Sequence, residues 1–431
     1  MRHETIRWMD AFVGRIVCFL LTVHRRVMDG LLGRNMATAR VTAEAPVTSI
    51  VFLKLIEQGA TVLAAPAIER AIELVGRKNV YFFVFRENRP ILDIIDLVLP
   101  ENVIEIRHDR LSHFFVDILS GLKRVRAIGI DTVINMEFLA RAPAIIAYLT
   151  GARRRVGMDR FTAEGPYCGD LMTHRVQFNP YLHVSLAYLL LIEVLDENPA
   201  DVPMSKVPAS REVLAPPQFV ATPDEAARLR ALVDRMAGQS TGRLVLLNPN
   251  TGDLLPRRLW ARERFVELGA RILESHSDVT IVLTGAPSER ESAEGVRRAI
   301  VAAAPPGREG HVVSLAGETT LRDVLVLYTI ASVLVTNDSG PGHFATMTDI
   351  ENVVLFGPET PDLFGPLGKH HRVMWAQLAC SPCVNPYNHR KTPCTNNVCM
   401  QVITVDQVHR VVTAALESTS AQVEAVAVVE A

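Results

Sequence analysis

Short apolar segments alternate with segments of helical apolar spacing along most of this chain, and the alternation comes in two series. In the first series, the strand candidates are residues 48–54, 80–85, 97–99, 103–106 and 132–135, and the helix candidates are 62–75, 111–125 and 142–149. In the second series, the strand candidates are residues 244–247, 280–283, 311–314, 333–335 and 353–355, with helices at 262–273 and 321–329. Such alternation favours parallel sheets covered on both faces. We therefore expect an α/β protein with two Rossmann-like halves.

A proline-rich stretch separates the two series. Residues 196–217 contain five prolines and little apolar periodicity, which is typical of an interdomain linker. A length of 431 residues also exceeds a single compact domain. We expect a helical extension and linker over residues 1–47, a first domain over 48–215, a second domain over 216–418 and a flexible tail over 419–431.

The overall charge excludes one class of function. Lys and Arg total 45 against 47 Asp and Glu, so the net charge is −2. A dedicated nucleic-acid binder relies on a strong positive field, which this chain lacks. We expect no nucleic-acid partner, and any anion-binding site must be local.

The N-terminal residues predict one long amphipathic helix. Its apolar run, Ile16 to Val23, is bounded by arginines and is too short to span a membrane. Residues 1–47 hold seven arginines and four acids, so we expect residues 1–34 to contact an anionic membrane surface. The alternative is packing on the protein's own body. Arg25, Arg26 and Asp29 argue against a secretory signal ending near Ala37.

Four of the six cysteines lie within twenty residues. Cys380, Cys383, Cys394 and Cys399 form the pattern C-x2-C-x10-C-x4-C. This pattern indicates a structural zinc site, packed free thiols or a redox-labile pair. The second pair is more widely spaced than in the usual zinc knuckle, so zinc is the lesser expectation.

The loops after the strand candidates hold the residues most suited to ligand binding, since ligands of doubly wound folds sit at the carboxyl ends of strands. After Val335, the sequence runs Thr-Asn-Asp-Ser-Gly-Pro-Gly-His343. Gly340 and Gly342 would let the backbone approach a ligand, and the amides that begin the next helix would bind phosphate. Ordinary helix capping by Asp338 or Ser339 is the alternative.

Two further loops belong to the same predicted edge. The loop after Leu247 offers Thr251 and Gly252 as hydroxyl and amide donors, and Arg257 and Arg258 as ligands for a diphosphate. A solvated basic loop is the alternative. Residues 356–368 are rich in turn-forming residues and would close over a nucleotide.

Taken together, several of these segments resemble glycosyltransferase family 9, the ADP-heptose:lipopolysaccharide heptosyltransferases. The segments are residues 338–343, 356–366, 248–260 and 380–400, and the resemblance covers roughly residues 48–415. It implies a GT-B fold of two Rossmann-like domains facing across a cleft. It also implies an inverting transfer that requires no metal cofactor, with the nucleotide sugar on the second domain and a lipid-linked saccharide acceptor on the first.

The resemblance assigns the donor-site residues by position. Asp338 and the backbone of Ser339, Gly340, Pro341 and Gly342 would hold the sugar and diphosphate, and His343 would steady that loop. Thr251 and Arg258 match the family's hydroxyl and basic phosphate ligands, with arginine where lysine is common.

One departure from the family concerns the catalytic base. The family usually has Gly-Asp after its first strand, whereas this sequence reads Glu57-Gln-Gly-Ala60. Because alanine cannot accept the acceptor's proton, we expect Glu57 to act as the base, with Glu137 as the second candidate. Helix capping or solvation is the alternative for either glutamate.

The first half contains one dense basic run, Arg153, Arg154 and Arg155. Arginine suits phosphate recognition, so these residues are predicted to bind an anionic glycolipid or saccharide acceptor. A solvated helix end is the alternative.

These expectations combine into one function. We predict heptose transfer from ADP-heptose during lipopolysaccharide or cell-surface glycan synthesis, by a cytoplasmic protein peripheral to the bacterial inner membrane. Transfer of another nucleotide sugar is one alternative. A catalytically silent nucleotide-sugar-binding protein is the other, and Ala60 is the argument for it.

Overall fold

The computed structural model describes residues 3–31, 46–138, 140–161, 166–206, 210, 214–252, 255–388 and 390–427. The chain divides into two compact units. Unit 1 comprises Met1–Leu214 and Asn385–Arg390, and unit 2 comprises Ala215–Val384 and Lys391–Ala431. The boundary between the units follows Leu214, one residue before the expected boundary after residue 215. The N-terminal extension is part of unit 1 and not a separate unit, and Asn385–Arg390 also belongs to unit 1.

Unit 1 is built on a six-stranded parallel sheet with the order β3-β2-β1-β4-β5-β6. The strands are β1 Ile50–Leu53, β2 Val80–Phe85, β3 Val103–Ile106, β4 Thr132–Asn135, β5 Arg154–Asp159 and β6 His174–Gln177. This is the strand order of the classical dinucleotide-binding fold, and it reverses direction between β1 and β4.

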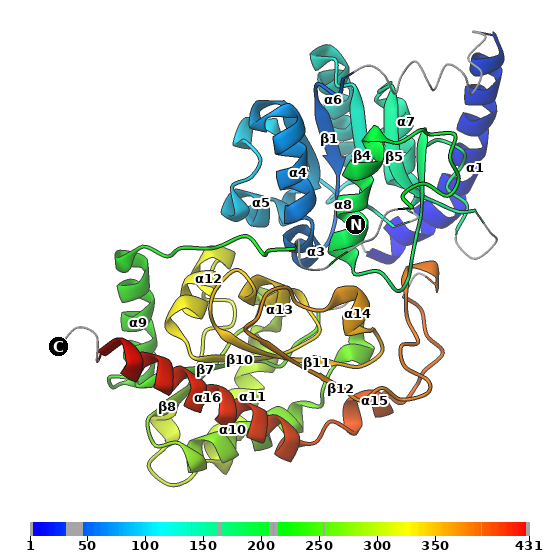
Figure 1. Cartoon of the computed structure of the whole chain (residues 1–431). Coiled ribbons are helices and arrows are strands. Elements are labelled where there is room, and N and C mark those ends of the chain that lie inside the picture. Colours follow the sequence, from blue (N-terminus) through cyan, green and yellow to red (C-terminus); the bar gives the residue numbers. More distant parts are fainter. Residues whose placement is uncertain are drawn as a thin grey trace. The chain divides into compact units, whose positions relative to one another are not determined.

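Helices cover both faces of this sheet, which explains why β1 is buried at every position. They are α1 His3–Leu31, α3 Gln58–Leu63, α4 Ala65–Val75, α5 Arg89–Ile95, α6 Leu111–Ile128, α7 Arg141–Leu149 and α8 Val184–Glu193. Residues of α1, α6 and α7 share one apolar cluster with the strands. Figure 1 shows α4 and α8 on the other face.

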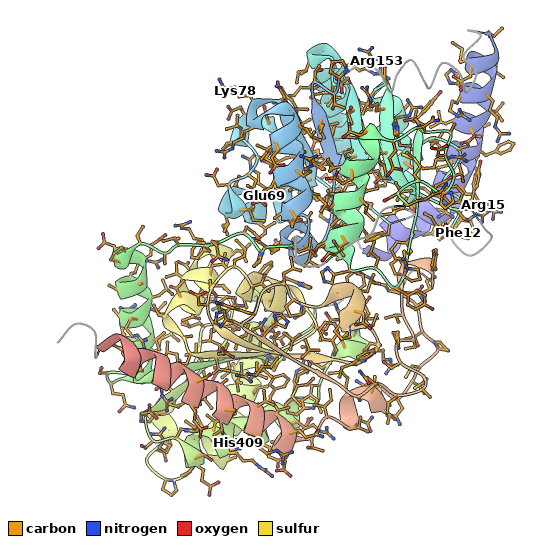
Figure 2. All side chains as sticks on the ribbon, viewed as in Figure 1. Phe12, Arg15, Glu69, Lys78, Arg153 and His409 are labelled. Carbon is orange, nitrogen blue, oxygen red and sulfur yellow. The ribbon has the colours of Figure 1, made fainter. Side chains whose placement is uncertain are left out.

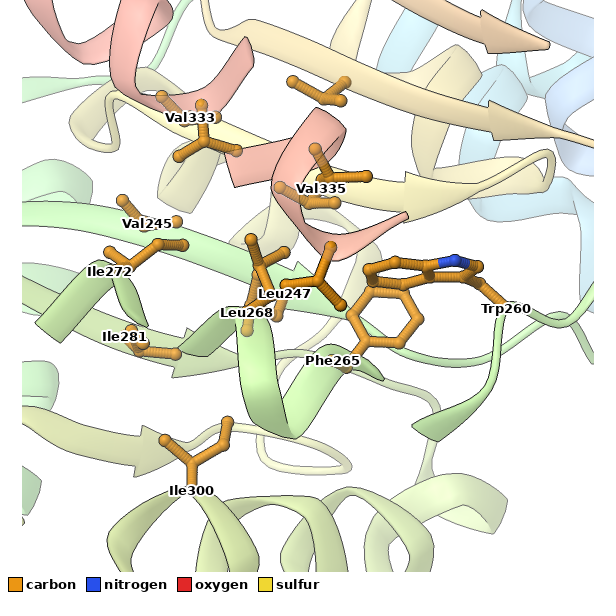
Figure 3. Close-up of a cluster of buried hydrophobic side chains, with 14 of the residues drawn as sticks. Val245, Leu247, Trp260, Phe265, Leu268, Ile272, Ile281, Ile300, Val333 and Val335 are labelled. Carbon is orange, nitrogen blue, oxygen red and sulfur yellow. The ribbon is translucent and has the colours of Figure 1, made fainter. Parts of the chain in front are cut away.

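Unit 2 repeats the same arrangement, with the order β12-β11-β10-β7-β8-β9 and every pair parallel. The strands are β7 Arg243–Asn248, β8 Val279–Leu283, β9 Val312–Ser314, β10 Val333–Asn337, β11 Glu351–Phe356 and β12 His371–Trp375. The helices are α9 Pro223–Ala237, α10 Arg262–Ser275, α11 Arg290–Ala303, α12 Leu321–Ile330, α13 Gly340–Ala345, α14 Pro361–Phe364, α15 Val398–Gln401 and α16 Val405–Ala427. Trp260 packs edge-on against Phe265 in the main apolar cluster (Figure 3).

The α/β class and the two Rossmann-like halves are confirmed, but individual elements differ from the expectation. Residues 97–99 are not a strand. They follow α5 and its cap residue Asp96, and the carbonyl of Leu97 accepts a hydrogen bond from Arg77 Nε instead of from a neighbouring strand. Three strands were not expected, namely β5, β6 and β12.

The two ends of the chain also differ in part from the expectation. The N-terminal helix is present as α1, while residues 32–45 of the predicted extension and linker lie outside the described residues. Helix α16 continues to Ala427, so it includes residues 419–427 of the tail that was expected to be flexible, and that flexibility stays a prediction. No helix within the described ranges is both long and apolar enough to cross a membrane.

Candidate functional site

Each unit carries a polar cluster where its strand order reverses. In unit 1, the reversal lies between β1 and β4, and the cluster follows their carboxyl ends. In unit 2, it lies between β7 and β10. Ligands of doubly wound sheets bind at these switch points, so we describe the two clusters as candidate sites, each within its own unit.

The cluster of unit 1 is organised around Glu137, which follows β4. Its Oε1 accepts hydrogen bonds from the backbone N–H groups of Leu55 (2.7 Å) and Ile56 (3.2 Å) and from Lys54 Nζ (3.3 Å). Lys54 is itself buried, and its Nζ also donates to the carbonyl of Ile56 at 2.7 Å. Glu137 therefore holds the loop after β1 in place.

Glu57 occupies the same loop with a less enclosed side chain. Its backbone adopts the left-handed conformation with φ 70°, immediately before α3. This conformation is uncommon for a residue other than glycine and costs about 1 kcal/mol or more. Glu57 Oε2 lies 3.8 Å from Lys54 Nζ, and Oε1 pairs with Arg390. The carboxylate is thus held by two cations at a strained position.

Arg390 reaches Glu57 from the short segment Asn385–Arg390 that joins unit 1. Within this segment, the hydroxyl group of Tyr387 donates a hydrogen bond to the carbonyl of Phe178 at 2.8 Å. The rings of Tyr387 and Phe178 also contact each other edge to face. The segment is therefore fastened beside the carboxylate cluster.

The pKa of buried Tyr188 depends on the charge of this cluster. Burial raises the pKa of Tyr188 well above its ordinary value, and the nearby carboxylates of Glu137 and Glu57 raise it further. Tyr188 is therefore a neutral hydroxyl at any physiological pH. Ala60, at the family's aspartate position, is buried in α3 and brings no carboxylate.

The cluster of unit 2 centres on a buried arginine. Arg258 Nη1 lies 3.6 Å from Asp338 Oδ2 and 3.7 Å from Glu359 Oε2, and all three side chains are at least nine-tenths buried. Both distances exceed that of a good hydrogen bond. Within the described part of the chain, Arg258 Nε finds no hydrogen-bond acceptor. The Nε–H group of Arg258 is therefore unpaired among the described residues, and Nη1 lies beyond good hydrogen-bond distance of both carboxylates.

Asparagines join the loops around this arginine. Asn337 Nδ2 donates to the carbonyl of Asn250 at 3.1 Å, and Asn337 Oδ1 accepts from the backbone N–H of Trp260 at 2.9 Å. Asn248 Nδ2 donates to Thr284 Oγ1 at 3.2 Å. The loops after β7, β8 and β10 are thereby held to one another by buried side chains.

The remaining predicted donor residues lie around the same edge. Thr251 is partly exposed, and Gly252 has φ 62°. Arg257 is exposed, and its Nη1 donates a hydrogen bond to the carbonyl of Thr395 at 3.1 Å. Its environment therefore differs from that of Arg258, which is buried.

The loop after β10 leads into α13. Ser339 Oγ donates to the carbonyl of Asn337, and Asn352 Nδ2 donates to the carbonyl of Gly342 at 2.8 Å. A Cβ at Gly342 would lie 3.3 Å from Val354, so the helix packs closely on β11 there. Gly340, Pro341 and His343 are partly exposed. The role of this loop in donor binding stays a prediction.

The basic run of unit 1 is not a solvated helix end. Arg154 and Arg155 begin β5, and only Arg153 is exposed (Figure 2). Burial lowers the pKa of Arg154, and it lowers that of Arg155 to about 10. The run lies at the amino ends of the strands, opposite the edge that carries Glu57 and Glu137. Acceptor binding by these arginines stays a prediction that their position does not favour.

The four clustered cysteines are free thiols. Among the described residues, no group of three or more His, Cys, Asp or Glu side chains is placed to hold a metal ion. Thr392 Oγ1 donates to Cys383 Sγ at 3.3 Å. Burial and then the neighbouring thiols raise the pKa of Cys399, which is typical of a packed thiol rather than a reactive one.

Three charged residues of these clusters were not predicted: Lys54, Glu359 and Arg390. Lys54 directly follows β1, and Glu359 lies in the turn-rich loop after β11, so strand-end position was a usable signal for both. Arg390 is 333 positions from Glu57 in the sequence, and nothing in the sequence pairs them.

Comparison with known proteins identifies a family. The model described as "Glycosyltransferase family 9 (heptosyltransferase)" matches residues 118–392, which is more than half of the chain. The lipopolysaccharide heptosyltransferase 2 of Salmonella typhimurium is 31% identical over 119 residues, or 28% of this chain and 32% of that protein. The matched segment thus spans about a third of the relative's length.

Solved structures extend the similarity to most of the fold. E. coli ADP-heptose lps heptosyltransferase II has a TM-score of 0.61 and 18% identity, covering 86% of this chain and all of the other. The E. coli heptosyltransferase WaaC, solved with ADP, has a TM-score of 0.57 and 18% identity, covering 85% of this chain and all of the other. The same enzyme was also solved with ADP-2-deoxy-2-fluoro heptose. At this identity the likeness establishes the GT-B fold.

Proposed function

Because the chain belongs to glycosyltransferase family 9, we propose that it transfers heptose from ADP-heptose to a lipid-linked saccharide in lipopolysaccharide synthesis. The names of the matched relatives and the ADP ligands of WaaC support this choice of donor and pathway. An acceptor of this class is lipid-linked, so we place the reaction at the cytoplasmic face of the bacterial inner membrane.

The main support for a donor site in unit 2 is the buried guanidinium of Arg258. It lies at the carboxyl edge of the second sheet between Asp338 and Glu359 and retains unused N–H donors. Arginine binds phosphate oxygens through a planar pair of donors. Arg258 would therefore bind the diphosphate and stabilise the charge that develops on it as the sugar leaves.

In the proposed inverting reaction, an acceptor hydroxyl oxygen attacks the anomeric carbon of the donor. The bond between that carbon and the diphosphate oxygen breaks, and ADP leaves with the electron pair. The hydroxyl proton passes to the carboxylate of Glu57, which acts as general base. No metal ion is assigned a role in this scheme.

A donor panel tests the proposal. The full chain is incubated with a membrane acceptor extract and ADP-heptose, UDP-sugars or GDP-sugars, and the products are identified by mass spectrometry. We expect turnover with ADP-heptose alone. Turnover with a UDP- or GDP-sugar instead would overturn the donor assignment, and binding of ADP without turnover of any donor would support the silent protein suggested by Ala60.

The donor site is tested separately by measuring the Kd for ADP. Arg258→Lys is expected to raise it by about tenfold or more, because lysine keeps the charge but loses the paired donors. Arg262→Lys is the matched control, since Arg262 is exposed at the start of α10. Equal Kd values for the two variants would exclude Arg258 as a phosphate ligand.

A further inference from the structure

Helix α1 presents its apolar side chains to the outside. Trp8, Phe12, Ile16, Phe19, Val27 and Leu31 are between 54% and 76% exposed. They recur every three or four residues, with one longer gap that Val23 fills, and so form one continuous stripe that we call the outer face of α1. An exposed apolar stripe of this length marks an interaction surface.

The opposite side of α1 is held on unit 1 by small and polar residues. Cys18 and Thr22 are buried, and Thr22 Oγ1 accepts a hydrogen bond from the backbone N–H of Asp170 at 2.9 Å. A Cβ at Gly14 would lie 3.0 Å from the side chain of Arg141. An ordinary surface helix packs its apolar side inward, so α1 has the reverse orientation, and its outer face is left for a partner.

Unbalanced positive charge borders the outer face. Arg15 and Arg26 are exposed beside it. Arg26 lies 3.5 Å from Asp170, whereas Arg15 forms no ion pair with a residue that the structure describes. Asp10 and Asp29 of the same helix are paired with Arg141 and Arg25. Asp10 and Asp29 are therefore neutralised, and Arg15 at the border of the stripe is available to an anionic partner.

A pocket opens next to this border. It has a volume of about 610 Å³, and its lining includes Arg15, Arg160, Ile16, Phe19 and Tyr167. Figure 2 labels Phe12 and Arg15 on this part of α1. A lining that combines guanidinium groups with apolar side chains matches the two parts of a phospholipid, a phosphate and the upper part of an acyl chain.

We propose that the outer face of α1 binds the surface of an anionic lipid bilayer. Its aromatic and aliphatic side chains enter the boundary between headgroups and acyl chains, while Arg15, Arg26 and Arg160 contact lipid phosphates. This deepens the proposed function, because a lipid-linked acceptor would be presented at such a surface.

The test measures binding of the full chain to phosphatidylcholine vesicles with and without phosphatidylglycerol, by flotation, in the absence of any sugar donor. The triple variant Phe12→Ser, Ile16→Ser, Phe19→Ser is expected to lower the partition coefficient by about 100-fold or more, since three exposed apolar side chains are lost. Arg15→Ser is expected to lower it by about fivefold on anionic vesicles only. Circular dichroism checks that each variant is folded.

The matched control is Val220→Ser with Met236→Ser, two exposed apolar side chains of unit 2. It is expected to bind vesicles like the wild type. The proposal is overturned if the wild type does not float with anionic vesicles or if the triple variant floats equally well. It is also overturned if light scattering shows a wild-type dimer that the triple variant converts to a monomer without any vesicle binding, because the outer face would then be covered by a second copy.

These outcomes are independent of sugar transfer. Vesicle binding without turnover would support membrane binding by the outer face of α1 and would overturn the proposed transferase activity. Turnover on a delipidated acceptor without vesicle binding would support the proposed transferase activity and would overturn membrane binding by the outer face of α1.

Discussion

At the scale of single residues, two glutamates of one cluster have different environments. Glu137 Oε1 already accepts two backbone hydrogen bonds and one from Lys54, so its carboxylate is committed to the loop after β1. Glu57 is less enclosed, and its carboxylate forms ion pairs with Lys54 and Arg390. Proton transfer requires a carboxylate oxygen that can reach the substrate, which favours Glu57 as the base.

The two glutamates are separated by measuring turnover and stability together. Glu57→Gln is expected to lower kcat with ADP-heptose by about 100-fold or more, because the amide cannot accept the proton, while the urea midpoint changes little. Glu137→Gln is expected to lower stability by about 1–3 kcal/mol, because a buried acceptor for three donors becomes a weaker one. Full activity in Glu57→Gln would show that the base is another residue.

At the scale of secondary structure, the start of α7 depends on α1. Asp10 Oδ1 accepts the backbone N–H groups of Arg141 (3.0 Å) and Ala142 (2.8 Å), which are the first two residues of α7, and Oδ2 lies 3.4 Å from the Arg141 guanidinium. Asp10 thus caps a helix 131 positions later in the chain, where a local side chain provides no cap. This contact determines which side of α1 packs against α7 and the rest of unit 1.

Removal of this cap is expected to loosen α1. Asp10→Ala should lower the free energy of unfolding by about 1–3 kcal/mol and speed hydrogen exchange in residues 141–149. Asp29→Ala is the control, since Asp29 forms an i,i+4 ion pair with Arg25 at the surface, and its loss should cost about 0.5 kcal/mol or less. Equal effects of the two substitutions would contradict a capping role for Asp10.

At the scale of the whole molecule, each unit has its own core and the same strand order. Phe83, Ile104 and Leu122 belong to a cluster of unit 1, whereas Leu268 and Ile300 belong to one of unit 2. Each core supports one polar cluster at the reversal of its strand order. Substitutions in one core should therefore affect that unit first.

A glycine substitution in unit 1 tests this separation. A Cβ at Gly121 would lie 2.5 Å from the ring of Phe83, so Gly121→Ala should cost about 1–3 kcal/mol and speed hydrogen exchange in β2 and β3, with β7 and β10 unchanged. Gly295→Ala on α11 meets nothing within 4 Å and should be neutral or raise stability by up to about 1 kcal/mol. Faster exchange throughout unit 2 in Gly121→Ala would show that the cores are coupled.

Periodicity predicted the strands whose residues are apolar and failed where polar residues are paired in the sheet. The strands at residues 80–85 and 132–135 were predicted with their exact ends. Strands β5 and β6 were missed because they contain Arg154, Arg155 and His174, whose burial depends on neighbours that are distant in sequence. The carboxyl-end rule located Glu57, Glu137, Arg258 and Asp338, because parallel strands bring their ends to one edge.

The sequence by itself determined the α/β class, the division near residue 215 and the loops that carry the polar clusters, because these follow from local periodicity and from the position of each loop along the chain. Only the tertiary structure decided which cations hold Glu57, that Arg258 is buried between Asp338 and Glu359, and that α1 turns its apolar face outward. The orientation of α1 is set by Asp10 and Thr22, whose partners lie more than 130 positions away. A helical pattern defines two faces, and the contacts that such partners make decide which of them is buried.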